Sequence, residues 1–303
     1  MEATPLEQLL REAPDDLAAW GAYSDVLLEK DDARSRLIEL ELRLTREVRV
    51  VERESLQSEI DLLTEEHQES WDAELPEGVE AVARCYGFAT KVAVDWSPEA
   101  PARIAEALQG RFVTRLRIRP GTAAQEADDE HWSDESDFDE DDMPLPLPPH
   151  EADGFADLDV GGIRELDLSY FRIGDPGANG LAAAASAGRV ATLDLRYCGI
   201  GSDGAAALAA SGKFGDVRRL HFQRNRLTGE GVRALACFER IEELDLRYNQ
   251  IGADGAQALI EAPFAGSLKR LLLHRQDVSE AGVKKLASAP QLPTALRSFW
   301  RSM

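Results

Sequence analysis

The segment GIGSDG at residues 199–204 has the spacing G-x-G-x-x-G of a turn that holds phosphate groups. In a dinucleotide site this turn follows a strand and opens a helix, and an acidic residue for the ribose comes about 20 residues later. A strand and a helix are expected on either side of it. The same positions recur, however, as structural positions in every repeat described below. The repeat accounts for these glycines, so we expect no nucleotide site.

Other signatures of catalysis are missing from the sequence. It contains no Walker loop, no H-E-x-x-H and no G-x-S-x-G. The histidines have no metal-ligand spacing with one another or with a cysteine; they are His67, His131, His150, His221 and His274. Acidic residues are abundant, but the spacing of a calcium loop is absent. We therefore expect no catalytic residue, no cofactor and no metal, and the chain is expected not to be an enzyme.

Five segments of the C-terminal half align without gaps. They are IRELDLSYFRI (163–173), VATLDLRYCGI (190–200), VRRLHFQRNRL (217–227), IEELDLRYNQI (241–251) and LKRLLLHRQDV (268–278). Their central leucines are Leu166, Leu193, Leu220, Leu244 and Leu271, with spacings of 27, 27, 24 and 27 residues. A fixed period of this length is the mark of a repeat architecture in which each unit packs on its neighbours.

Each repeat is predicted to run strand, loop, helix. The alternation L-x-L directs Leu166 and Leu168 to one face of a strand and the residues between them to the other. An apolar anchor seven residues after the central leucine is followed by a helix N-cap: Gly174, Gly201, Thr228, Gly252 or Ser279. A glycine four residues after the anchor, as at Gly204, is expected to let the helix lie close to the sheet.

This pattern resembles the ribonuclease-inhibitor class of leucine-rich repeats. The period, the L-x-x-L-x-L core and the helical second half carry the resemblance, together with Asn225 and Asn249 after the strand, where Cys198 is a tolerated substitute. Phe171 and Gln276 depart from the pattern. The resemblance implies an α/β solenoid over residues 76–303, with parallel strands inside and helices outside, that binds another macromolecule.

Two weaker units precede these repeats. They are FATKVAVDW (88–96) and FVTRLRIRP (112–120), with a helix expected between them at 98–108. Leu116 and Leu166 are 50 residues apart, so one repeat is expected to be replaced or distended. At the other end TALRSFWRSM (294–303) is expected to cap the core with Phe299 and Trp300.

Residues 1–75 are predicted to be helical. One helix begins after Asp15 and Asp16, and a long helix or a helix pair begins near Arg34, with apolar positions Leu37, Leu40, Leu44, Val48, Val51, Leu56, Ile60 and Leu63. The first 45 or so residues resemble the bacterial repeat-companion domain. The matching residues are Pro14, Asp15, Asp16, Tyr23, Asp25, Leu28, Glu29, Asp32, Arg34 and Ile38; Asp31 and Ser35 stand where glycines are usual.

Residues 121–160 form a predicted disordered insertion in the repeats. Residues 126–142 contain 11 acidic residues, and MPLPLPP follows. Such a charge density cannot bury enough apolar surface to order itself. Three roles are open. The segment is a passive insertion, an acidic segment that attracts and binds a basic partner, or a flap that lies on the chain's own strands and is anchored by Trp132 and Phe138.

The net charge of −22 is unevenly distributed. Residues 161–303 contain 19 basic and 15 acidic residues, so the first 160 residues carry a charge of −26. This excess disfavours nucleic acid and anionic membranes. The acidic start lacks a secretory signal pattern, and three cysteines predict no disulfide framework. We expect a bacterial cytoplasmic protein, a monomer, without nucleic-acid or membrane partners.

The residues beside the inward leucines should project onto a concave strand surface. The candidate partner-binding residues there are Tyr170, Arg196, Tyr197, His221, Gln223, Arg224, Arg247, Tyr248, His274 and Arg275. Tyr and Arg are enriched at interface hot spots. The alternative is that the tyrosines only stack along the sheet and the arginines only pair with neighbouring Asp194 and Asp245.

Three kinds of function remain open from the sequence, besides a free-standing enzyme. The first is a protein-binding module acting as a scaffold, an inhibitor or an immunity-type partner. The second is an acidic chaperone or mimic that binds a basic partner through residues 126–142. The third is a regulator of an enzyme such as a small GTPase, which rests on the analogy of fold alone.

Overall fold

The computed structural model describes residues 4–121, 152–184 and 186–302. These form two compact units, Met1–Ala93 with Glu106–Thr114, and Val94–Ala105 with Arg115–Met303. The first unit thus continues beyond the boundary at residue 75 that the sequence suggested. The acidic tract 126–142 lies outside the described residues, and so do Trp132, Phe138 and the proline run.

The first unit contains four helices and a strand pair. They are α1 (Pro5–Glu12), α2 (Leu17–Leu28), α3 (Arg34–Arg46), α4 (Val50–Asp72), β1 (Val79–Cys85) and β2 (Phe88–Asp95), whose end belongs to the second unit. The region predicted as a long helix or a helix pair is a pair, α3 and α4. The helix is interrupted at Glu47–Arg49. As a result Val48 and Val51 are exposed and do not join the core.

Aromatic rings form the core of the first unit. Trp20 packs on Tyr86 and Phe112, with ring centroids 4.6 and 5.0 Å apart. The guanidinium of buried Arg34 lies 4.4 Å from the centroid of the Phe88 ring, within cation–π range. Asp31 has φ 56°, in the left-handed region that favours glycine.

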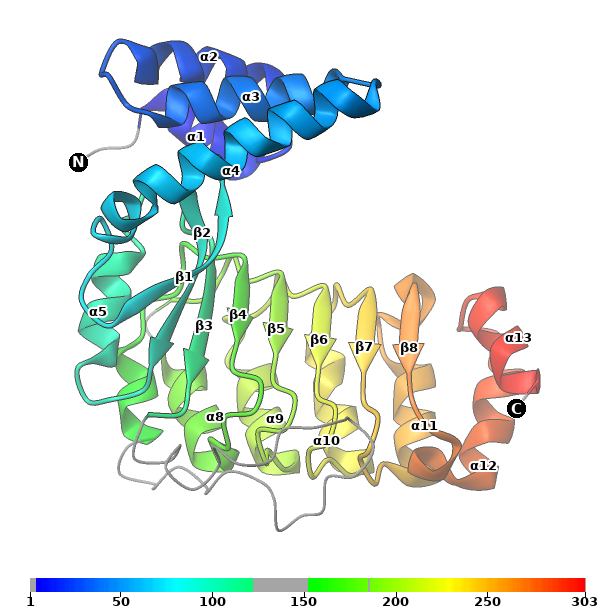
Figure 1. The fold of residues 1–303 in the computed structure, drawn as a ribbon. Helices are drawn as coiled ribbons and strands as arrows, with labels where there is room; N and C mark the ends of the chain where they lie inside the picture. The colour runs from blue at the N-terminus through cyan, green and yellow to red at the C-terminus, as the bar shows by residue number, and fades with distance from the viewer. Residues whose placement is uncertain (1–3, 122–151, 185, 303) are drawn as a thin grey trace, which may run out of the picture. The chain divides into compact units, whose positions relative to one another are not determined.

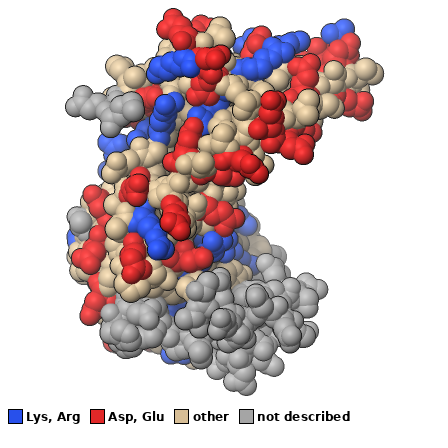
Figure 2. Space-filling view, turned by 60° about the vertical axis from the view of Figure 1, so that its left-hand side comes forward, with Lys and Arg blue, Asp and Glu red and all other residues tan. Residues whose placement is uncertain are grey.

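Acidic and basic side chains both lie on the surface of the first unit. Figure 2 shows residues of both signs beside uncharged ones. Some of them pair: Arg36 lies 2.7 Å from Glu39 and 3.1 Å from Glu59. Such exposed pairs contribute at most about 1 kcal/mol each.

The second unit is a series of strands, and each strand from residue 165 onward is followed by a helix (Figure 1). The strands are β3 (Arg115–Arg119), β4 (Glu165–Asp167), β5 (Thr192–Asp194), β6 (Arg219–His221), β7 (Glu243–Asp245) and β8 (Arg270–Leu272). The helices are α5 (Ala100–Ala107), which spans both units, α8 (Gly174–Ala183), α9 (Ser202–Ala210), α10 (Gly229–Ala234), α11 (Gly252–Glu261), α12 (Arg275–Ser288) and α13 (Thr294–Ser302). Short 3-10 turns lie at Asp153–Asp157, Leu235–Cys237 and Ala265–Ser267.

The central leucines align in one register across the parallel sheet. Leu116 pairs with Leu166, and Leu193, Leu220, Leu244 and Leu271 follow in order. These leucines are buried, and helices α8 to α12 are ranged along one side of the sheet in Figure 1. Because β3 pairs directly with β4, no other strand separates these two in the sheet.

Two asparagines bind the backbone of the loops after the strands. The side chain of Asn249 accepts a hydrogen bond from the Leu227 N–H and donates to the Phe222 carbonyl. Asn225 makes the corresponding bonds to Ile200 and Leu195. A buried backbone group without a partner costs about 1–3 kcal/mol, so these side chains stabilise the turns.

The glycine four residues after each anchor lies against that anchor and, from Gly204 onward, also against the preceding helix. A Cβ at Gly204 would come within 2.5 Å of Asp175 and 2.9 Å of Ala178. A Cβ at Gly255 would meet Ile251 at 2.6 Å. The atoms nearest to such a Cβ belong to the anchor and the preceding helix and not to a strand, so packing between successive helices takes the place of the expected contact with the sheet.

Residues 152–160, assigned above to the insertion, are packed into the second unit. Phe155 is fully buried, and its ring stacks on Trp96 with centroids 4.1 Å apart and planes 7° apart. At the other end Trp300 is buried in α13, whereas Phe299 is exposed. Only one of the two aromatic residues expected to cap the core does so.

Candidate functional site

The strand face is the side of the sheet opposite the buried leucines. Residues one before, one after and three after each central leucine share this face because side chains alternate along a strand. The shared register stacks them into rows, of which the first after the leucine is Arg117, Asp167, Asp194, His221, Asp245 and Leu272. The strand face is therefore polar in most repeats.

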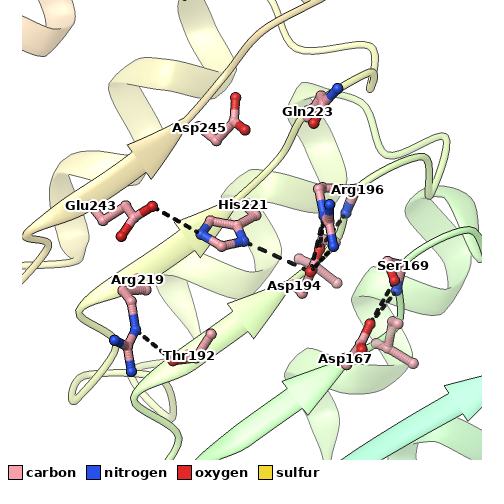
Figure 3. Close-up of polar contacts among 12 residues, drawn as sticks. Asp167, Ser169, Thr192, Asp194, Arg196, Arg219, His221, Gln223, Glu243 and Asp245 are labelled. Atoms are coloured by element: carbon pink, nitrogen blue, oxygen red, sulfur yellow. Dashed lines mark hydrogen bonds and ion pairs between the residues drawn. The ribbon is translucent and has the colours of Figure 1, made fainter. Parts of the chain in front are cut away.

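Two arginines on the strand face are fixed by the aspartates two residues before them. Arg196 Nη2 lies 2.7 Å from Asp194 Oδ2, and Arg247 Nη2 lies 2.7 Å from Asp245 Oδ2 (Figure 3 shows the first pair). Arg247 also donates to the Gln223 amide oxygen at 3.2 Å. Both aspartates are buried while both guanidinium groups stay half-buried, so each arginine presents part of its surface in one orientation.

The Asp194 carboxylate is held in its charged form. Burial alone would raise its pKa, but the neighbouring side chains of His221 and Arg196 outweigh burial and lower the pKa to about 2. The pKa of Arg196 is raised, chiefly by its hydrogen bond to Asp194. The pair therefore stays ionised at neutral pH.

His221 occupies the place that aspartate takes in the neighbouring repeats. Its Nδ1 lies 3.7 Å from Asp194 and its Nε2 lies 3.7 Å from Glu243 (Figure 3). Beside it, Arg219 Nε donates to the Thr192 hydroxyl at 3.0 Å. His221 therefore lies between two carboxylates on the strand face.

A row of aromatic and cationic side chains lies one residue further along each repeat. Tyr170 stacks on Tyr197 at 4.5 Å, Arg224 lies 5.5 Å from the ring of Tyr197 and 5.8 Å from that of Tyr248, and Tyr248 lies 4.5 Å from His274. The backbone φ lies between 52° and 64°, in the left-handed region, at Tyr170, Tyr197, Arg224 and Tyr248. This backbone turns the side chains along the sheet onto their neighbours.

The ten candidate residues differ in accessibility. Tyr197 is buried between its neighbours, whereas Tyr248 is 42% exposed. Arg275 opens α12 and pairs with Glu280. The stacking and the Asp–Arg pairing that were considered as the alternative are both present.

Sequence reasoning missed Arg219, Glu243 and Arg270, which alternation along the strand could have placed on the same face.

The glycine motif does not offer a phosphate site. The N–H groups of Gly201 and Gly204 donate to Asp175 Oδ1 at 2.7 and 3.0 Å. A carboxylate of the preceding repeat thus takes the place that an anion takes at a helix N-terminus. In the ranges that the structure describes, no three His, Cys, Asp or Glu side chains gather to hold a metal ion.

None of the helices described here is both long and apolar enough to cross a membrane.

No curated protein matches the chain. Three stretches match the family model described as Leucine Rich repeat, at residues 191–209, 216–236 and 241–259. They cover β5 with α9, β6 with α10 and β7 with α11. Within residues 191–259 the chain is therefore built of leucine-rich repeats.

Proposed function

We propose that the chain is a non-catalytic module that binds another protein through its strand face, as a scaffold, an inhibitor or an immunity-type partner. Leucine-rich repeats are typically protein-interaction modules, which supports a binding role. The observation that carries the choice of surface is the fixed orientation of Arg196 and Arg247 by buried aspartates.

Fixed side chains favour tight binding. Ordering a long side chain at an interface costs about 0.5–1.5 kcal/mol of binding free energy. Because Arg196 and Arg247 are already ordered in the free protein, binding does not incur this cost for them. Arg224 is likewise placed between Tyr197 and Tyr248 before any partner arrives. In this proposal Tyr248, Arg224 and Arg247 contact the partner, while buried Tyr197 packs against Arg224.

The same proposal places the protein in the cytoplasm as a monomer. Its cysteines Cys85, Cys198 and Cys237 are free thiols, which supports a reducing compartment. The asparagines of the turns support the ribonuclease-inhibitor class of repeat, and the buried Arg34 and Tyr23 support a repeat-companion-like first unit.

The experiment is affinity capture from a native lysate with four baits. They are the intact chain, a Tyr248→Ala/Arg275→Ala variant, a control Arg233→Ala/Gln257→Ala variant, and a chain lacking residues 126–142. Tyr248 and Arg275 are exposed, so their truncation should leave stability within about 0.5 kcal/mol. Arg233 is exposed on α10, and Gln257 lies on α11.

A partner lost only with the Tyr248/Arg275 variant would support the strand face. Retention by that variant would move the interface elsewhere. Loss only on deletion of 126–142, with a steep decline of affinity in salt, would favour the acidic chaperone or mimic instead. An unchanged GTPase rate on addition of the chain would exclude regulation of the GTPase tested.

A further inference from the structure

A pocket of about 290 Å³ opens at the amino-terminal ends of strands β5 to β8. It is lined by Ala191, Arg218, Arg219, Glu242, Glu243, Lys269 and Arg270. Arg218, Glu242 and Lys269 occupy the same repeat position as Ala191. The small side chain of Ala191 thus leaves open the space that a long side chain takes in its neighbours.

Cations outnumber carboxylates around this pocket, four to two. Glu242 is shared by Arg218 at 3.0 Å and Lys269 at 2.6 Å, and the hydrogen bond from Lys269 is the largest influence that lowers its pKa. Glu243 lies 3.2 Å from Arg270. Two carboxylates shared among four cations leave a positive excess at the pocket.

The backbone in this pocket is already satisfied. The Ala191 carbonyl accepts the N–H groups of both Arg218 and Arg219, and the Glu242 carbonyl accepts those of Lys269 and Arg270. A ligand is therefore recognised through side chains. Arg219 donates to the neutral Thr192 hydroxyl, which does not neutralise its charge.

We propose that this pocket binds a carboxylate side chain on an acidic peptide segment of the partner protein, with Arg219 and Arg270 as its main cations. This inference rests on the proposed function and deepens it by naming the chemistry of the partner. Guanidinium groups match the planar carboxylate with two parallel hydrogen bonds. Glu242 and Glu243 also line the pocket and limit its excess to two positive charges, which suits a single carboxylate better than a run of phosphates.

The test is fluorescence anisotropy of a labelled hexaglutamate peptide with the full chain in about 0.1 M salt. An Arg219→Glu/Arg270→Glu variant should weaken binding by about tenfold or more, since it reverses two charges beside the carboxylate. Arg233→Glu on α10 makes a charge change of the same kind away from the pocket and should alter affinity by less than about twofold.

A second variant separates the pocket from general attraction. Ala191→Phe fills the space without changing any charge. If hexaglutamate binds in the pocket, its affinity should decrease by about threefold or more. If only general electrostatic attraction holds the peptide, its affinity should not change. Circular dichroism melting of each variant checks that the fold persists.

Three results would overturn the proposal. They are unchanged affinity in Ala191→Phe, equal weakening by Arg233→Glu, and tighter binding of an oligothymidylate than of hexaglutamate. If capture shows a partner on the strand face, but the pocket variants bind hexaglutamate as tightly as the intact chain does, only this inference fails. Loss of hexaglutamate binding in the pocket variants, with capture unaffected by Tyr248→Ala/Arg275→Ala, would instead contradict the partner contact proposed for Tyr248 and leave the pocket as the binding site.

Discussion

The carboxylate of Asp175 lies 2.7 Å from the backbone nitrogen of Gly201, one repeat further along the chain. The same oxygen accepts the Gly204 N–H, so Asp175 caps α9 from outside that helix. This contact joins α8 to α9 by hydrogen bonds in addition to apolar packing. It also explains why no side chain fits at Gly204.

Replacing Asp175 by alanine should destabilise the second unit. Loss of a helix cap costs about 1–2 kcal/mol, and here two N–H groups lose their acceptor. Urea unfolding followed by circular dichroism measures the change. Asp203→Ala, an exposed carboxylate in the first turn of α9 itself, is the matched control and should cost only a few tenths of a kcal/mol. Equal losses in both variants would contradict the role of Asp175.

Replacing Ser279 by glycine should stabilise the protein. Ser279 has φ 63° and ψ 169° inside α12, a region that is open essentially only to glycine. The equivalent residues Gly174 and Gly252 have φ 59° and 63°. The gain should be about 1 kcal/mol, seen as a higher midpoint in thermal unfolding.

The control for Ser279→Gly is Thr228→Gly at the same repeat position. Thr228 has φ −105°, and its hydroxyl accepts the Glu230 N–H. Glycine there relieves no strain and removes a cap, so stability should decline. If both substitutions shift stability in the same direction, strain at Ser279 is not the cause.

The contribution of Asp194 to stability should depend on pH. Its pKa in the folded chain, about 2, lies below the unfolded value of about 3.9. A depressed pKa means that the stabilisation, about 2 kcal/mol, is complete above pH 4 and is lost as the pH falls towards 2.

Comparison with Asp194→Asn isolates this term from the other carboxylates. The difference in unfolding free energy between the two proteins should be largest near pH 7 and shrink below pH 4. Urea unfolding at several pH values measures it. A difference that stays constant from pH 7 to pH 2.5 would show that the charge of Asp194 contributes nothing.

Replacing Phe155 by alanine should strongly destabilise the second unit. The fully buried ring stacks on Trp96, so truncation leaves a cavity that costs about 3–5 kcal/mol. Phe299→Ala removes a ring that is 47% exposed and should cost much less. Comparable losses in thermal unfolding would mean that residues 152–160 are not part of the core.

The repeat register was predictable because one leucine per repeat marks it. Leu166 to Leu271 align in the sheet as their spacings require, and Asn249 and Asn225 bind the turns. These features repeat in sequence, so a single chain displays them several times. Asp175 was predictable only as a helix-dipole carboxylate of its own helix, because its contact with the next repeat appears once.

The orientation of single side chains could not be read from the repeat. Tyr197 belongs to the row expected on the strand face, yet its left-handed backbone turns the ring onto Tyr170 and buries it. Phe299 and Trp300 are adjacent and both aromatic, and only the rotation of α13 decides which is buried. The pocket at Ala191 depends on the absence of a long side chain, which no motif marks.

A related contact joins the next two repeats, where the Ser202 hydroxyl accepts the Thr228 N–H just before α10. At both junctions the earlier repeat supplies the acceptor, Asp175 for Gly201 and Ser202 for Thr228. The dependence therefore runs in one direction along the chain. Removing repeats from the C-terminal end leaves these two acceptors in place, whereas removing the repeat that contains Asp175 or Ser202 takes the acceptor from its successor.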